Sequence, residues 1–204
     1  MRKILLSLFL MMPIIVNTST EIDSYDLTEL TIQMNREINN YKEMVRLDSM
    51  KRATMQHIKV FLYALGQRES SNNPDTFNTL GYIGKYQFGK LALKDVGLDH
   101  VSYEKFVEDR SIFPEELQDS AVIKLMKLNE KRLEQLIDKY EHKVIAGIYI
   151  TRSGILAAAH LSGARNVQKF FRSNGHHNPA DAYGTKLSDY LKEFSGYNID
   201  LAYL

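Results

Sequence analysis

The chain has no cysteine among its 204 residues. This absence excludes disulfide bonds, thiolate metal sites, a cysteine nucleophile and a lipid-modified N-terminal cysteine. It also agrees with an oxidising compartment, where a free thiol would be a liability. Hydrophobic residues make up 44% of the chain and charged residues 25%, so a wholly disordered or collagen-like protein is excluded as well.

A large net charge is also missing. Lys and Arg together number 26 and Asp and Glu 25, which gives a formal net charge of +1. Without Arg2 and Lys3, which fall in an expected leader, 24 basic residues stand against 25 acidic ones and the net charge is −1. No overall basic field remains to attract DNA or RNA. We therefore expect no nucleic-acid partner.

A run long enough to cross a membrane is missing too. Residues 4–16 are almost wholly apolar, but a bilayer crossing takes about 20 residues. With the basic start at Arg2 and Lys3, this segment predicts a secretory signal peptide over residues 1–20, although a buried N-terminal helix is an alternative. The cleavage pattern at residues 16–18 is poor, so an uncleaved leader could tether the protein. We expect no transmembrane domain beyond the leader, and export to the periplasm, cell envelope or extracellular space.

Apolar periodicity predicts that the rest of the chain is mostly helical. A stripe with spacings of 3, 4, 4, 3 and 4 predicts an N-terminal amphipathic helix over residues 21–50. Its members are Leu27, Leu30, Met34, Ile38, Tyr41 and Val45. This helix either packs on the domain or uses residues 27–45 to bind another chain, such as an envelope or secretion-machinery partner. Asp48 or Ser49 is a suitable N-cap for the next helix, and a compact body over residues 51–204 follows.

The compact body contains one segment that is not helical in pattern. Residues 70–90 are rich in Ser, Asn, Gly and Pro, which predicts a loop with short strand. Helical patterns return after Pro114 and over the alanine-rich residues 155–161. The fold class predicted is mainly α, a helical domain with a small loop or β-hairpin segment.

The first segment with chemical potential surrounds Glu69. This residue stands where an apolar helix is expected to end and a polar loop to begin. A carboxyl group partly buried beside apolar side chains is easier to protonate than one in water. Such a group can act as a general acid. A solvated surface carboxylate is the alternative interpretation.

The second segment is the glycine- and aromatic-rich stretch at residues 81–89. Glycine lets the backbone turn sharply or approach a ligand closely, and aromatic rings stack on the apolar faces of sugars. Gln87 adds an amide donor and acceptor. A tight hairpin whose aromatic residues fill the core is the alternative. Residues 84–90 also match the start of a phosphate-binding loop, but Leu91 stands where that loop needs Ser or Thr, so no nucleotide site is expected.

The third segment contains His160 within the small-residue stretch 153–163. Its imidazole can face a cleft or be a hydrogen-bonded core residue. The chain has six histidines, and none forms the H-E-x-x-H pattern of zinc enzymes. We therefore predict no metal site and no cofactor.

Together these segments resemble the lysozyme-like soluble lytic transglycosylases. The motifs are Glu-Ser-Ser-Asn at 69–72, Gly-x-x-Gln-Phe at 84–88 and Ala-Ala-His-x-x-Gly at 158–163, in the family's order and spacing. Residues 178–191 are similar to the tail of a transglycosylase-like subfamily. The resemblance covers roughly residues 55–197.

The resemblance implies an α+β lysozyme-like domain over residues 51–204, with the loop or hairpin forming one wall of a glycan cleft. Such a domain cuts peptidoglycan between N-acetylmuramic acid and N-acetylglucosamine. Glu69 would protonate the glycosidic oxygen, and the sugar's own 6-hydroxyl would then form a 1,6-anhydro product. Ser71 and Gln87 would line the cleft, with Tyr86 as a sugar platform.

The resemblance has one departure. His160 stands where the family has Tyr, and Leu161 where it has a substrate-contacting Asn, so His160 is expected to supply the polar contact. A hydrolytic muramidase, with Asp75 or Asp95 as second carboxylate, is one alternative. A catalytically inactive peptidoglycan-binding or scaffolding protein is another. The third is an unrelated helical interaction protein whose residues 27–45 form a coiled coil.

Overall fold

The computed structural model describes the backbone of residues 24–203 and the side-chain environments from Leu27 to Ala202. The predicted signal peptide, residues 1–20, lies outside the described residues. The chain divides into two compact units between Ser49 and Met50. None of the helices in the described part of the chain combines the length and hydropathy that a bilayer crossing requires.

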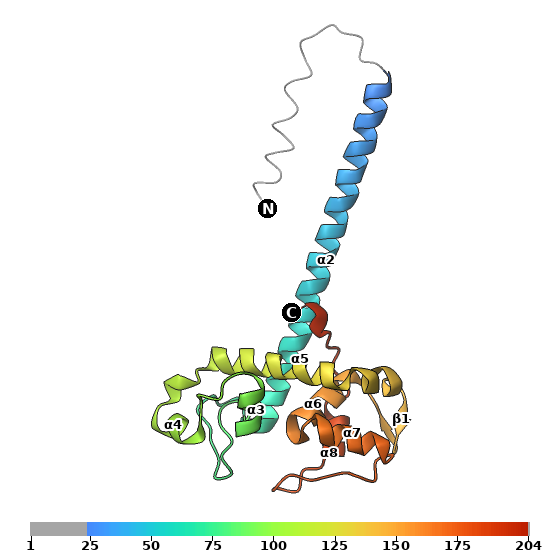
Figure 1. Cartoon of the computed structure of the whole chain (residues 1–204). Coiled ribbons are helices and arrows are strands. Elements are labelled where there is room, and N and C mark those ends of the chain that lie inside the picture. Colours follow the sequence, from blue (N-terminus) through green and yellow to red (C-terminus); the bar gives the residue numbers. More distant parts are fainter. Residues whose placement is uncertain (1–23, 204) are drawn as a thin grey trace. The chain divides into compact units, whose positions relative to one another are not determined.

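The described part of the chain is mainly helical, which confirms the predicted class (Figure 1). Its one regular sheet is a two-stranded antiparallel hairpin that pairs Val144 with Tyr149 and Ile145 with Ile148. The elements in chain order are α2 (Ser24–Ser70), α3 (Lys90–Asp95), α4 (Tyr103–Glu108), η2 (Arg110–Ile112), α5 (Glu115–Tyr140), β1 (Val144–Ile145), β2 (Ile148–Tyr149), α6 (Arg152–Ser162), α7 (Ala164–Arg172), α8 (Leu187–Glu193) and η3 (Leu201–Tyr203).

The helix α2 is continuous from Ser24 to Ser70. The predicted N-cap at Asp48 or Ser49 is therefore wrong. The physical reason is that no proline or glycine stands between Ser24 and Gly66, and a single Asp or Ser lowers helix stability by only a fraction of a kcal/mol, roughly 0.5. A capping residue thus marks a helix start only where the preceding turn cannot be helical.

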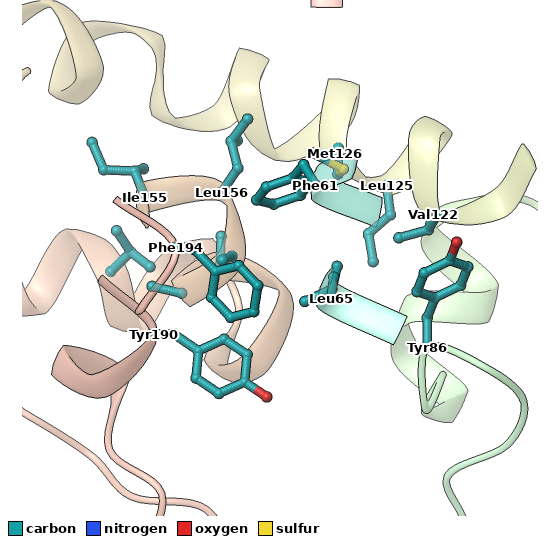
Figure 2. Packing of buried hydrophobic residues seen from close by; sticks show 14 of the residues in the cluster. Phe61, Leu65, Tyr86, Val122, Leu125, Met126, Ile155, Leu156, Tyr190 and Phe194 are labelled. Atoms are coloured by element: carbon teal, nitrogen blue, oxygen red, sulfur yellow. The ribbon is translucent and has the colours of Figure 1, made fainter. Parts of the chain in front are cut away.

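The C-terminal part of α2 lies at the centre of the core of the second unit. Figure 2 shows Phe61 and Leu65 between Tyr86 on one side and Tyr190 and Phe194 on the other. The helix α5 covers this cluster with Val122, Leu125 and Met126. The loop segment and α3 and α4 thus lie on one side of this C-terminal part of α2, and α6 to α8 on the other (Figure 1).

The segment between α2 and α3 is irregular, as the sequence predicts. Isolated bridges pair Ile83 with both Phe77 and Phe88, so the chain folds back on itself twice within a few residues. Ile83 and Phe88 are buried, whereas Tyr82 stays exposed. Both the loop and the hairpin descriptions of this segment are therefore partly met, since only some of its apolar residues, Ile83 and Phe88 among them, reach the core.

Gly154 in α6 permits close packing against the C-terminal end of α8. A Cβ atom at this position would lie 2.6 Å from the carbonyl oxygen of Leu191. We expect Gly154→Ala to destabilise the domain by about 2 kcal/mol, because the two helices must move apart to admit the methyl group. Urea unfolding monitored by circular dichroism measures this. Gly196→Ala is the matched control, since nothing lies within 4 Å of a Cβ there, and an equal loss in both variants would contradict the account.

Candidate active site

Glu69 lies in the last turn of α2 with its side chain half-buried. The phenol oxygen of Tyr190, in α8, donates a 2.6 Å hydrogen bond to Glu69 Oε1. The other carboxyl oxygen, Oε2, accepts no hydrogen bond from any residue between 24 and 203 that the structure describes. The carboxyl group is therefore fixed at one oxygen, while the second is available to another molecule.

Tyr190 is a buried donor that the sequence motifs did not single out. Its ring packs against that of Phe194, with centroids 5.3 Å apart, and Arg68 lies 5.8 Å above it. Burial raises the pKa of the Tyr190 hydroxyl far above its ordinary value, and the negative charge of Glu69 adds to the shift. The hydroxyl thus keeps its proton at neutral pH and remains a donor to Glu69.

Ser70 joins the end of α2 to the glycine-aromatic segment. Its Oγ donates a 2.7 Å hydrogen bond to the carbonyl oxygen of Lys85 and accepts one of 3.1 Å from the Asn73 amide. Ser71, which is predicted to line the cleft, lies in the exposed turn after α2 with a φ of 57°. The residue adjacent to Glu69 therefore ties the first and second motifs together.

His160 joins the third motif to the second. Its Nε2 lies 2.9 Å from the carbonyl oxygen of Tyr86, and since a carbonyl only accepts, Nε2 carries the proton. The imidazole and the Phe88 ring meet edge to face, with centroids 6.1 Å apart. Nδ1 is buried and finds no hydrogen-bond partner among the described residues. His160 is thus held at the glycine-aromatic segment by one ring nitrogen.

Gln87 is engaged within its own loop. Its Nε2 donates to the carbonyl oxygen of Gly84 and its Oε1 accepts from Asn78, both at 2.9 Å. The residue has a positive φ of 47°, so the loop holds it in a conformation that few side chains adopt. Its amide fixes the turn and stays half-buried beside the segment that Ser70 and His160 contact.

The prediction that Tyr86 is a sugar platform is wrong. The residue is 1% exposed, and its hydroxyl points toward α5, where it donates a 2.7 Å hydrogen bond to Asp119 (Figure 2). A ring with both faces in the core cannot stack on a sugar. Burial, together with this hydrogen bond, raises the pKa of the Tyr86 hydroxyl. The apolar ring and the carboxylate partner explain why it turns inward.

Lys85 completes the link between the glycine-aromatic segment and α5. Its Nζ lies 2.9 Å from Glu115 and 3.1 Å from Asp119. Burial lowers the pKa of the Lys85 amine, but the hydrogen bonds and charges of the two carboxylates outweigh it and the net shift is upward. Asp119 therefore accepts hydrogen bonds from both Tyr86 and Lys85 and anchors this loop on α5.

Gln118 is a buried clamp that sequence reasoning missed. Its Oε1 accepts a 2.6 Å hydrogen bond from the Lys85 amide, and its Nε2 donates to the carbonyls of Pro74 (2.9 Å) and Phe113 (2.6 Å). One side chain therefore satisfies three backbone groups from three parts of the chain. The available signal was its place on the apolar face of α5, where a polar residue needs partners.

Asp75 and Asp95, the candidate second carboxylates for a hydrolytic reaction, are not bonded to Glu69. Asp95 forms a bidentate pair with Arg132 at 2.7 and 3.2 Å, and the hydrogen bond from Arg132 lowers the pKa of Asp95. Asp75 is exposed in the loop after α2. Neither shares a hydrogen bond with Glu69 in the described structure.

The second unit has two surface hollows that are lined by residues other than Glu69, Gln87 and His160. One is lined by Val60, Tyr63, Ala64, Gln67, Arg68, Glu193 and Tyr197. The other lies between α5 and α7 and is lined by Lys131, Arg132, Glu134, Gln135, Leu136, Lys139, Tyr140, Gln168, Phe171 and Arg172. Within residues 24–203, no cluster of three or more His, Asp or Glu could hold a metal ion.

No protein-family model, curated protein or solved structure matches the chain. The function is therefore inferred from the site itself. Its central geometric fact is that the second motif binds both of the others. The carbonyl oxygen of Lys85 binds Ser70, 15 residues earlier in the chain, and that of Tyr86 binds His160, 74 residues later. Glu69 directly precedes Ser70 in the chain, and its donor Tyr190 comes from α8.

Proposed function

We propose that the protein is an exported peptidoglycan-cleaving enzyme, a lysozyme-like lytic transglycosylase in which Glu69 is the general acid and base. The observation that carries the proposal is the junction of the three motifs. Ser70, next to Glu69, and His160 bind adjacent carbonyl groups of the Lys85–Tyr86 segment. Residues that the family resemblance groups by sequence are thus grouped in space by hydrogen bonds.

The proposed chemistry uses one carboxyl group. Glu69 Oε2, which has no described protein donor, gives its proton to the glycosidic oxygen as the bond from that oxygen to C1 breaks. The resulting carboxylate is stabilised by the hydrogen bond from Tyr190 to Oε1. It then takes the proton of the sugar's 6-hydroxyl as O6 bonds to C1. The anhydro ring forms without water, and Glu69 regains its proton.

A single-carboxylate reaction suits the bonding around Glu69. Retaining and inverting glycosidases of the ordinary kind place a second carboxyl group about 5–9.5 Å from the acid. Here the group that binds the Glu69 carboxyl is a phenol, and Asp95 is committed to Arg132. Attack by the sugar's own 6-hydroxyl needs no second carboxylate, and the bonding around Glu69 is compatible with it.

The proposal is tested by incubating residues 21–204 with purified peptidoglycan sacculi and weighing the soluble products by mass spectrometry. Products with 1,6-anhydro ends, lighter by one water than hydrolysis products, support lytic cleavage. Reducing ends would instead make the protein a muramidase and direct attention to Asp75. Binding to sacculi without any release would make it a peptidoglycan-binding protein, with Leu161 as the first residue to restore to the family's Asn.

Tyr190→Phe is expected to lower the rate of product release at saturating sacculi by about 10- to 100-fold. A hydrogen bond to a charged group contributes about 1.5–3 kcal/mol, and this one strengthens as Glu69 loses its proton. The half-saturating amount of sacculi should change little, because Tyr190 is a positioning residue and is buried. Tyr183→Phe is the control, since Tyr183 is exposed on the loop before α8. Equal rates in the two variants would remove Tyr190 from the mechanism.

A further inference from the structure

The apolar stripe of the first unit is exposed along its whole length. Its six side chains, Leu27, Leu30, Met34, Ile38, Tyr41 and Val45, are each between 43% and 52% exposed. Every residue from 27 to 53 is exposed. Isolated helices are marginal in water, because most helical stability in proteins comes from packing of an apolar face. A partner that covers this stripe would therefore stabilise the segment.

The spacing of the stripe is that of helices that pack along their length. The steps 3, 4 and 4 repeat every 11 residues, so that Leu27 is followed by Ile38 at the same position. An 11-residue repeat corresponds to about 3.67 residues per turn and gives a nearly straight or slightly right-handed pairing. The next positions of the repeat are Ser49 and Arg52. The stripe therefore ends at the division between the two units.

The charges beside the stripe distinguish the direction of pairing. Glu37 flanks it on one side and Lys42 on the other, and neither has an ion partner among the described residues. They lie on opposite edges of the stripe, five residues apart, so in a parallel, in-register pair Glu37 of one helix and Lys42 of the other lie along the same edge of the interface. An antiparallel pair would place the Glu37 edges of the two helices against one another.

We propose that residues 27–45 bind the same segment of a second copy in a parallel, in-register helical dimer. Glu37 of one protomer faces Lys42 of its partner, and two-fold symmetry makes this pair twice. The six stripe residues of each protomer then cover those of the other. The proposal is independent of the glycan-cleaving function, because it uses no residue of the second unit.

Single-cysteine variants of the full-length chain test the pairing, since the natural chain has no cysteine. Leu27→Cys and Val45→Cys lie at the two ends of the stripe, and Arg36→Cys on the opposite helix face is the matched control. Mild oxidation should give covalent dimers for both stripe variants and little for the control. A parallel register is overturned if neither position cross-links to itself, or if the control cross-links equally well.

A charge exchange gives a second, independent measurement. Light scattering of the full-length chain should give twice the chain mass of 23.5 kDa. Glu37→Lys or Lys42→Glu alone should raise the dimer dissociation constant by about 10-fold, because each change replaces two attractive pairs by two repulsive ones. The double exchange should restore it. A monomeric natural chain, or a double variant as weak as the single ones, would overturn the proposal.

Discussion

Glu69→Gln is expected to reduce release of soluble fragments from sacculi by about 1,000-fold. An amide of nearly the same shape cannot donate the proton that the leaving sugar needs, and a general acid contributes about 10²–10⁴ in rate. Tyr190 can still donate to the amide oxygen, so the fold should be preserved. The measurement is the initial rate of release, with circular dichroism and sacculus binding recorded for the same preparation.

The matched control for Glu69→Gln is Glu108→Gln. Glu108 ends α4, is exposed and forms no ion pair or side-chain hydrogen bond with the described residues. Its substitution removes one negative charge without touching the site, and the rate should stay within about twofold of the natural protein. A Glu69→Gln protein that binds sacculi and releases fragments at the natural rate would refute the assignment of Glu69.

Gln118→Met is expected to lower the free energy of unfolding by about 3 kcal/mol. The substitution keeps the length of the side chain but leaves the Lys85 amide and the carbonyls of Pro74 and Phe113 without their partner. A buried backbone group that loses its only partner costs about 1–3 kcal/mol, and here three groups share one side chain. Urea unfolding measures the loss.

Ser120→Ala is the control for Gln118→Met. Ser120 lies on the same helix, is exposed, and bonds only the carbonyl oxygen of Glu116. It should cost less than about 0.5 kcal/mol. Gln118 holds the loop that Ser70 and His160 contact. Gln118→Met should therefore also reduce glycan cleavage when activity is measured at a temperature well below the melting temperature of the variant. A stable variant with natural activity would show that this clamp does not position the site.

The sequence alone predicts the helical class and the motifs around Glu69 and His160, because both depend on local order and spacing. It predicts neither the hydrogen bond from Tyr190 to Glu69 nor the one from His160 to Tyr86. Both join residues more than 70 positions apart, and the spacing of residues along one helix does not specify which distant side chain will meet it. The family resemblance indicates which motifs belong together, and only the folded chain shows which of their residues are hydrogen-bonded.

Tyr86 shows why residue type alone misassigned a role. An aromatic ring suits a sugar and a core equally well, and the choice depends on whether the hydroxyl finds a buried partner. Asp119 provides that partner from a helix 33 residues later. The predicted helix start at Asp48 or Ser49 is wrong for a related reason. Both residues are good caps, but they are also tolerable interior residues when both flanking segments favour helix.

Ser70 and Ser71 differ in a way that sequence does not reveal. Both follow Glu69, yet the left-handed φ of Ser71 turns the chain and leaves only Ser70 directed at the Lys85 carbonyl. The turn begins at Ser71 because its amide closes back on Gln67 while the next amide, that of Asn72, closes on Gly66. Asn72 packs against Gly66 so closely that a Cβ there would meet its side-chain oxygen.

In the proposed reaction, Glu69 cleaves glycan strands without using water. The most direct test is the mass of the fragments that residues 21–204 release from sacculi in water enriched in oxygen-18. We expect fragments with 1,6-anhydro ends and no incorporated label, and we expect these fragments to disappear in Glu69→Gln. Reducing ends that carry the heavy oxygen would contradict it, because that oxygen can enter only by hydrolysis.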